Sequence, residues 1–305
     1  MNTEHWLSKG VFGIVGALLV SATVGGEEQA PPPPSQQKQV TESVQPGVDA
    51  ERRDVVETKR KAMLEEAISA VEETKNALSA LEKNSKDEAL AALQKATGKL
   101  EILVSRDPKM ALTPIDVDVI AHDIYSSLEA IKRAKDEAED FLEDGKVQKA
   151  RPLIQALASE IVIRTTNLPL GTYPSAIKAV APLIDADKVD QAKEALQQAL
   201  NTLVVTKNVI ALPLLRAELM LEHADELAQK PSKTGAEHEE AKRLMVNARY
   251  QLVLAEALGY GEKHDYQQLT GMLDQVDTQL AAKKASKDTF AGIHSSLSRL
   301  RRSIF

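Results

Sequence analysis

The chain has 305 residues, of which 43% are hydrophobic and only 3% aromatic, so its core is built mainly from Ala, Leu, Val and Ile. The net charge of −7 argues against the basic stripe of a nucleic-acid binder, and we expect no nucleic-acid partner. The absence of cysteine excludes disulfides, thiolate metal sites and cysteine nucleophiles. This composition is typical of one soluble helical domain with terminal extensions.

Residues 1–26 have the pattern of a secretory signal peptide. Lys9 precedes an apolar run over residues 10–24, which is shorter than the ~20 apolar residues of a membrane-spanning helix. Small residues then give way to acidic ones, so we expect cleavage before Glu27 and a periplasmic protein. The run lacks an Ala-x-Ala site, which leaves an uncleaved inner-membrane anchor facing the periplasm as the alternative.

Residues 27–52 contain four consecutive prolines, Pro31–Pro34, followed by Ser, Gln, Thr and Glu and then by Pro46-Gly47. We find no helical periodicity in this stretch. Such a composition predicts a disordered or polyproline spacer before the folded part of the chain.

The domain expected at residues 53–284 shows apolar residues at helical spacing of three and four. Ser85 and Glu88 form a capping-box pattern for its second helix. Thr113-Pro114 has the N-cap and N1 residues of a third helix, and Gly145 has the position of its C-cap. We find no alternating run between turn signals, so the expected fold is all-α, a bundle of helical hairpins with no sheet.

The sequence pattern of one helical hairpin occurs twice in this domain, between residues 144 and 214. The series Val147, Ala150, Ile154, Leu157 and Ile161 recurs forty-two residues later as Val189, Ala192, Leu196, Ala199 and Leu203. A period of this length is typical of stacked helical hairpins, which usually make binding or scaffolding surfaces. The repeat predicts equivalent burial of Ile154 with Leu196 and of Ile161 with Leu203. It also assigns the β-branched runs 161–163 and 203–205 to last turns of helices.

Polar residues follow each copy of the repeat and form the best candidate for a ligand site. They are Arg164, Thr165, Thr166 and Asn167 after the first copy and Thr206, Lys207 and Asn208 after the second. If the copies stack, these side chains converge near Tyr173, where they could bind a small anionic or planar ligand. The alternative is that they hydrogen-bond carbonyl groups left unpaired at helix C-termini.

No pattern in the chain predicts catalysis. His238-Glu239-Glu240 begins like the helix of a zinc protease, but Lys242 stands where the second histidine is needed. The sequence contains no Gly-rich phosphate loop and no nucleophile elbow. We therefore expect no enzyme, no metal site and no cofactor.

Residues 285–305 are expected to form a basic amphipathic C-terminal helix. Its stripe of apolar residues favours a final helix docked on the bundle, with its basic face in solvent. Contact with an anionic membrane surface or with a partner is the alternative. The residues that would make this contact are Phe290, Ile293, Leu297, Arg299, Leu300, Arg301 and Arg302.

Three longer stretches resemble a known family. ASEIVIRTTNLPLGTYPSAIKA (158–179), ALNTLVVTKNVIALPLLRAE (199–218) and RYQLVLAEALGYG (249–261) are similar to the YfdX family of exported bacterial stress proteins. The resemblance covers roughly residues 59–280. It implies an all-helical, often homo-oligomeric periplasmic protein linked to acid, heat or drug stress, without an established enzymatic activity. It also implies chaperone-like action on unfolded client proteins, with small-molecule binding as the alternative.

Overall fold

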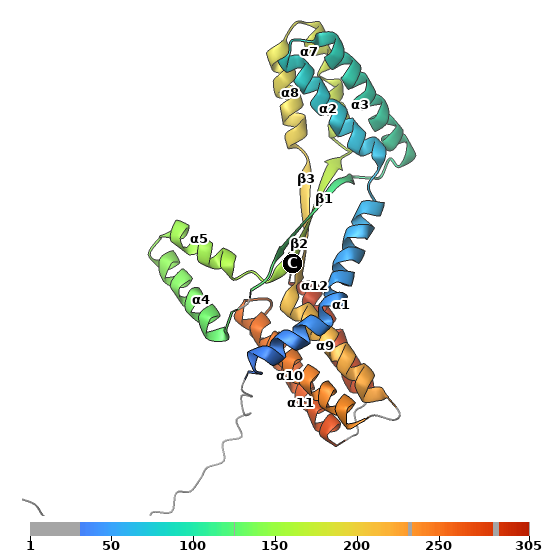
Figure 1. Ribbon diagram of the computed structural model, residues 1–305. Helices are drawn as coiled ribbons and strands as arrows, with labels where there is room; N and C mark the ends of the chain where they lie inside the picture. Colours follow the sequence, from blue (N-terminus) through green and yellow to red (C-terminus); the bar gives the residue numbers. More distant parts are fainter. Residues whose placement is uncertain (1–30, 125, 231–233, 283–286, 305) are drawn as a thin grey trace, which may run out of the picture. The chain divides into compact units, whose positions relative to one another are not determined.

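The computed structural model describes residues 31–124, 126–230, 234–282 and 287–304. Its elements belong to the unit that begins at Pro32 (Figure 1). The helices are α1 (Pro34–Lys61), α2 (Glu65–Glu82), α3 (Lys86–Arg106), α4 (Leu128–Glu143), α5 (Val147–Ala156), α6 (Tyr173–Lys178), α7 (Ala181–Asp185), α8 (Val189–Asn201), α9 (Leu212–Gln229), α10 (Gly235–Ala257), α11 (Lys263–Ala281) and α12 (Lys287–Ser303). The strands are β1 (Leu112–His122), β2 (Glu160–Pro169) and β3 (Val204–Ala211).

The three strands form one antiparallel sheet in the order β1-β2-β3, so the prediction of an all-α fold without a sheet is wrong. Burial alternates along the first part of β2, where Ile161 and Ile163 are buried and Arg164 is exposed. A helical last turn would not produce this period of two. β-Branched residues pack well on such a pleated surface, which is why the runs at 161–163 and 204–205 are extended.

Residues Thr113-Pro114 lie in strand β1 and do not begin a helix. Pro114 is tolerated because β1 is an edge strand and because the register of its pairing with β2 shifts between Pro114 and Asp116. The stretch from Ile115 to Val119 alternates between apolar and acidic residues, which is the pattern of a half-buried strand.

Three hairpins of the described chain share one turn: α2–α3, α4–α5 and α7–α8. Asn84, Gly145 and Asp187 end their first helices with φ of 59°, 71° and 60°. In each turn the next N–H donates to the carbonyl five residues earlier, at 2.8, 2.7 and 2.8 Å in chain order. This is the Schellman motif, and it confirms Gly145 as the residue that ends α4. Ser85 is the N-cap of α3 but makes no side-chain capping bond.

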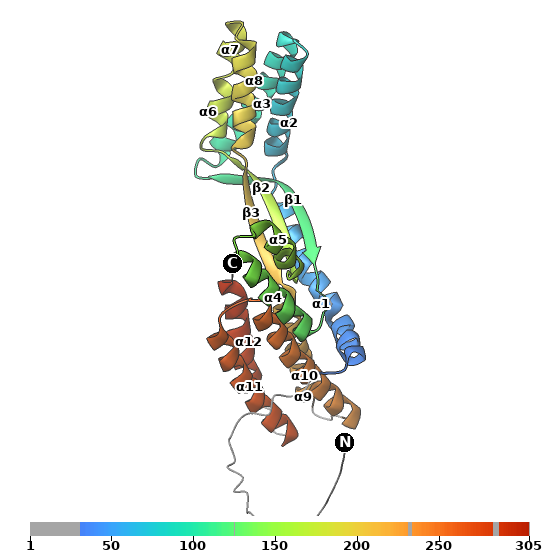
Figure 2. The same cartoon turned by 90° about the vertical axis from the view of Figure 1, so that its left-hand side faces the viewer.

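The hairpins α2–α3 and α7–α8 pack together with α6 in one hydrophobic core, which also takes in Leu168 and Leu170 at the end of β2. A second core joins α9, α10, α11 and α12 and includes Ala211 at the end of β3. Figures 1 and 2 show these two groups of helices at opposite ends of the sheet.

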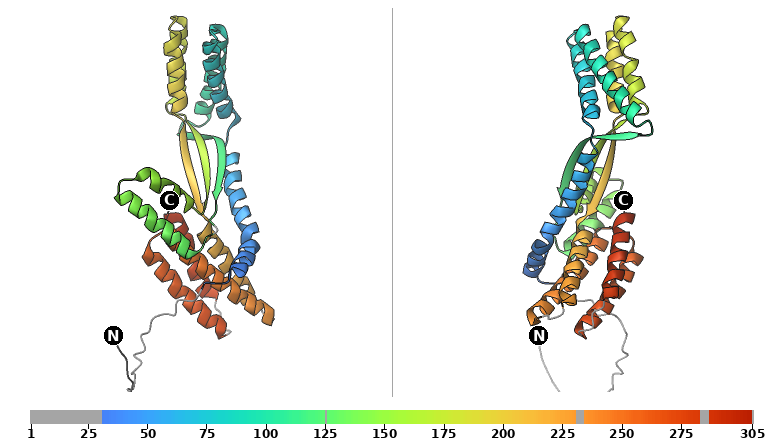
Figure 3. Two further views of the ribbon diagram at one scale, coloured as in Figure 1. Left: turned by 60° about the vertical axis from the view of Figure 1, so that its left-hand side comes forward. Right: turned by 90° about the vertical axis from the view of Figure 1, so that its right-hand side faces the viewer.

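Helix α1 occupies residues 34–61, where the sequence led us to expect a disordered spacer as far as residue 52. Val40, Val44 and Val48 recur every four residues, and all three are buried against α9 and the sheet. At Gly47 a Cβ atom would lie 2.9 Å from the Leu219 side chain, so the glycine permits this close approach. Figure 3 shows α1 running along the sheet. The predicted signal peptide and residues 27–30 lie outside the described residues.

Helix α12 buries the apolar stripe that we considered for membrane contact. Phe290, Ile293, Leu297 and Leu300 are all buried in the core with α9 and α11. Arg301 forms ion pairs with Glu218 of α9 and, at 3.0 Å, with Glu51 of α1. The helix is therefore docked, with these four apolar side chains inside the core. Arg299 and Arg302 remain exposed.

Candidate functional site

The hairpin α4–α5 exposes large apolar side chains. Leu142, Val147 and Ile154 are 45%, 52% and 48% exposed, and we call these three residues the hairpin face. Leu142 lies near the end of α4, whereas Val147 and Ile154 lie on α5 at the spacing of one helix face. The predicted equivalent burial of Ile154 and Leu196 is wrong, because Leu196 is fully buried.

Two of these three positions, those of Leu142 and Ile154, are buried in the other two hairpins. Counted from the shared turn, Leu142 corresponds to Leu81 of α2 and to Ile184 of α7, which are 0% and 2% exposed. Ile154 corresponds to Leu93 of α3 and to Leu196 of α8, both of which are also buried. These four counterparts lie in the common core of α2–α3 and α7–α8. Hairpin α4–α5 thus presents the face that its two relatives cover with each other.

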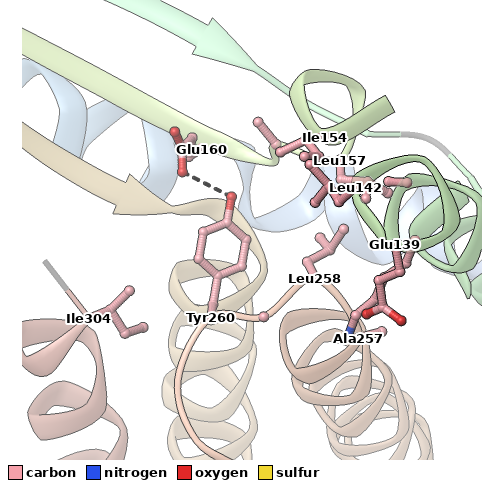
Figure 4. A pocket seen from close by; sticks show the side chains of 13 residues that line it. Glu139, Leu142, Ile154, Leu157, Glu160, Ala257, Leu258, Tyr260 and Ile304 are labelled. Atoms are coloured by element: carbon pink, nitrogen blue, oxygen red, sulfur yellow. Dashed lines mark hydrogen bonds between the residues drawn. The ribbon is translucent and has the colours of Figure 1, made fainter. Parts of the chain in front are cut away.

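The hairpin face borders a cavity of about 460 Å³ (Figure 4). Leu142, Ile154 and Leu157 line one side of it, and Leu258 and Tyr260 from the α10–α11 turn line the other. Lys135 and Glu139 of α4, Glu160 of β2 and Ile304 at the end of α12 also contribute to the lining. The lining is therefore mainly aliphatic, with a few charged groups among the apolar side chains.

Tyr260 fixes the wall opposite the hairpin. It stands between Gly259 and Gly261, whose φ values of 83° and 98° make the tight turn that ends α10. Its hydroxyl accepts a hydrogen bond from the backbone N–H of Ser159 at 2.9 Å and donates one to Glu160 Oε2 at 3.0 Å. Burial raises the pKa of Tyr260 above its ordinary value, so the phenol stays protonated and can donate.

A buried ion pair joins α9 to the end of β1 close to Tyr260. Arg216 of α9 donates from Nη1 and Nη2 to the two carboxylate oxygens of Asp123, at 3.0 and 2.6 Å. The Ser159 hydroxyl donates to the same carboxylate at 3.1 Å. The Arg216 side chain is only 6% exposed. Asp123 directly follows β1 and Ser159 directly precedes β2, so this bidentate pair fixes the strand ends beside the cavity.

The polar residues predicted as a ligand site come together only in part, because Thr165 lies opposite Thr206 and Arg164 lies opposite Lys207 on paired strands. Arg164 ion-pairs with Asp118 on β1, and Lys207 and Asn208 are exposed on β3. Asn167 is buried and donates from Nδ2 to Thr206 Oγ1 at 3.0 Å, beside the buried Thr165. These residues lie on paired strands, where successive side chains point to opposite faces of the sheet.

Tyr173 lies in the helical core of α2, α3, α6, α7 and α8, which also includes Leu168, the residue after Asn167. Its burial raises the pKa of its hydroxyl to about 12. A second cavity, of about 420 Å³, lies between α3 and α6. Neither this cavity nor the one beside the hairpin face is lined by any of the eight predicted residues, Thr166 included.

The sequence-based interpretation missed the hairpin face, because its apolar series was taken for core. One signal could have revealed it. The Schellman turn and the buried alanines Ala89, Ala150 and Ala192 occur in three hairpins. Two of these hairpins, α2–α3 and α7–α8, cover each other's apolar faces, which leaves the apolar face of α4–α5 uncovered.

Among the described residues, no group of three or more His, Asp or Glu side chains could hold a metal ion. No helix of that same part of the chain combines the length and the apolar character needed to cross a bilayer.

Comparison with solved structures finds YfdX from Salmonella Typhi, with 15% sequence identity and a TM-score of 0.35. The alignment covers 49% of this chain and 93% of that chain. A search of curated proteins found no match. The family model described as YfdX protein matches residues 70–209, which run from α2 into β3 and include the hairpin face. The chain is therefore similar to the YfdX family over residues 70–209, slightly less than half of its length.

Proposed function

We propose that this chain is a periplasmic stress-response protein that holds unfolded client segments on the hairpin face and so keeps them from aggregating. The observation that carries the proposal is the exposure of Leu142 and Ile154 at positions that the two related hairpins bury, with Val147 exposed on the same hairpin. Contiguous exposed apolar residues rimmed by polar ones are typical of surfaces that bind other polypeptides. The proposal involves no catalytic step, metal or cofactor.

The size of the hairpin face suits weak, reversible binding. Full burial of a Leu, Val or Ile side chain contributes roughly 1.5–3 kcal/mol. About half of each of the three side chains is already covered, so a client that buries the remainder gains roughly half of that amount per residue. Association itself costs roughly 4–15 kcal/mol. The three residues together therefore gain no more than association costs, so a client must also bury the apolar lining of the adjacent cavity, and its binding stays weak enough for release.

The chemistry of the face favours aliphatic client segments. The cavity beside it is lined mainly by Leu, Ile and Ala, with Lys135, Glu139 and Glu160 among them, and Tyr260 is the one aromatic side chain of the lining. The hydroxyl of Tyr260 is already engaged by Ser159 and Glu160. The apolar part of the lining consequently selects for apolar character and not for one particular sequence, as a protein with many clients requires.

Replacing Ile154 with Glu should abolish most of the protection that the protein gives to a heat-denatured reporter enzyme. A carboxylate on the face would have to be desolvated whenever an apolar segment covers it. The measurement is light scattering of the reporter at increasing ratios of the variant. Because Ile154 is half exposed, the variant should keep its helical circular dichroism and its melting temperature.

The matched control is Ile102→Glu. Ile102 is also a helical isoleucine, 46% exposed, but it lies on α3 and lines neither cavity. The Ile102→Glu variant should protect the reporter as well as the wild type does. Equal loss of protection in both variants, or in neither, would contradict the assignment of client binding to the hairpin face.

A further inference from the structure

We propose that the outer edge of β3 binds an extended peptide as a fourth strand of the sheet, with a carboxylate of that peptide beside Lys207. The partner is a segment of another polypeptide that is rich in β-branched residues and carries one Asp or Glu among them. This site is separate from the hairpin face, and the inference does not depend on client binding there.

Strand β3 leaves its outer edge uncovered over most of its length. In the described part of the chain, β2 is the one strand that pairs with it. Every residue from Val204 to Asn208 is exposed, so neighbouring elements leave both faces of this stretch open. Val204 and Val205 are 38% and 55% exposed. An edge strand presents a row of backbone N–H and C=O groups to which a further strand can pair.

The opposite edge of the sheet is protected against such pairing. Strand β1 contains Pro114, which has no N–H to donate, and its register with β2 shifts between Pro114 and Asp116. Asp116 and Asp118 add exposed carboxylates, and α1 packs beside the strand (Figure 3). Proline, bulges, charges and a covering helix are the usual means by which proteins block an edge.

Strand β3 lacks most of these protective features. It contains no proline, its register with β2 is regular, and Lys207 is its one charged residue. Most of its other residues are β-branched, which favours an extended backbone and packs well on a pleated surface. The difference between the two edges identifies β3 as the side at which the sheet can accept another strand.

A row of charges across the sheet also ends unbalanced at β3. Asp118, Arg164 and Lys207 lie opposite one another on β1, β2 and β3. Arg164 donates from Nε to Asp118 Oδ2 at 3.2 Å, and its hydrogen bonds hold the pKa of Asp118 below the ordinary value. The charge of Arg164 is therefore already matched by a carboxylate.

Lys207 has no such match. It lies opposite the Arg164 cation, and no ion pair among the described residues includes it. Like charges directly opposite each other on paired strands are destabilising, whereas opposite charges are stabilising. A carboxylate on a strand added to β3 would lie beside Lys207 and balance the row. This charge complementarity is the reason for an acidic residue in the partner.

The alternation of β3 defines the rest of the peptide. Val205 and Val209 lie on the same face as Lys207, two residues away on either side. The partner therefore needs an apolar residue two positions before its carboxylate and another two positions after it. Thr206 and Asn208 on the other face favour small polar residues. A capped peptide Thr-Val-Thr-Glu-Thr-Val-Thr has this pattern and serves as the probe.

The first test is fluorescence anisotropy of the labelled probe, titrated with the full chain. The wild type should bind it, and Lys207→Glu should bind it about tenfold more weakly, because attraction across the strands becomes repulsion. A second probe with Lys in place of Glu should show the reverse preference and bind Lys207→Glu more tightly than the wild type. Absence of binding, or equal affinity of both probes for both chains, would overturn the inference.

Matched variants on the two edges locate the binding. Asp116 and Val205 both lie opposite Thr166, one on each side of β2. Val205→Asp should weaken binding of the Glu probe, because it replaces an apolar contact by a like charge. Asp116→Lys should leave the affinity unchanged. Tighter binding to Asp116→Lys, with Val205→Asp unaffected, would place the peptide elsewhere and contradict the assignment to β3. Both residues are exposed, so both variants should keep the wild-type melting temperature.

Infrared spectroscopy shows whether the bound probe is a strand. Isotope-labelled carbonyl groups in the probe should acquire the amide absorption of a β-strand when the protein is added. A bound probe whose carbonyl groups keep the absorption of an unstructured peptide would be held by its charge alone, and pairing with β3 would be refuted.

Cross-linking decides between a peptide and a second copy of the chain as the occupant of the edge. The chain has no cysteine of its own, so single cysteines can be introduced. A short bis-maleimide should join Val205→Cys to a probe that carries Cys in place of one Val, and it should not join Asp116→Cys to that probe. If Val205→Cys is joined only to another copy, even in excess probe, the proposed partner is wrong.

Discussion

Replacing Leu196 with Ala should lower the free energy of unfolding by about 2–5 kcal/mol, whereas Ile154→Ala should lower it by less than about 1 kcal/mol. The two residues occupy equivalent positions in related hairpins, but Leu196 is 0% exposed and Ile154 is 48% exposed. Truncation of Leu196 leaves a cavity in a close-packed core, and truncation of Ile154 removes atoms that already contact water. Urea denaturation followed by circular dichroism measures both values.

The control is Ala192→Gly against Ala150→Gly. Both alanines are 0% exposed, so their costs should agree. Equal costs for Leu196 and Ile154 would show that the hairpin face is buried within the single chain, contrary to the structure.

Replacing Asp123 with Ala should destabilise the fold by about 3–5 kcal/mol, because it leaves the charge of Arg216 buried without its carboxylate. The Arg216 and Asp123 side chains are 6% and 19% exposed. The double variant Asp123→Ala with Arg216→Met should recover much of the loss, since no uncompensated charge remains. Thermal and urea unfolding of the single and double variants measure the effect.

The exposed carboxylate of Asp274 provides the comparison. It pairs with Arg249 at 2.7 Å, but its side chain is 65% exposed and Arg249 also contacts Asp277. Asp274→Ala should therefore cost less than about 1 kcal/mol. If Asp123→Ala costs no more than Asp274→Ala does, the buried pair does not fix the strand ends as the geometry indicates.

Local sequence signals located most of the helices of the folded part. Pro213 stands in the first turn of α9, and Gly259 and Gly261 mark the end of α10. Gly145 adopts the positive φ that a Schellman turn needs. These signals act over a few residues, and for that reason the sequence alone is enough to identify them.

The sheet and α1 could not be located in the same way. The run Ile161–Ile163 is apolar throughout, so its sequence is compatible with a helical turn or a strand, and pairing with β1 and β3 decides between them. In α1, Val40, Val44 and Val48 are separated by polar residues and proline, and their burial depends on α9 and the sheet. Both outcomes rest on contacts between distant segments.

The candidate site also could not be located from local sequence signals alone. Periodicity identified Ile154 as a residue on the apolar side of its helix, which is correct. It could not tell what covers that side, because the covering surface comes from elsewhere in the fold. Leu196 meets such a surface on α2, and Ile154 meets solvent beside Leu258. The proposed client-binding surface is thus recognised by a difference in burial between related hairpins and not by a sequence motif.

Amide hydrogen exchange during client binding is the most direct test of the proposal that the hairpin face holds unfolded segments. The protein would be incubated at low concentration with and without a heat-denatured reporter, and exchange would be followed by mass spectrometry of peptides. We expect the client to slow exchange in α4 and α5 and in the α10–α11 turn around Leu258. Unchanged exchange in the α4–α5 hairpin, with slowing confined to β3 or another segment, would contradict the account.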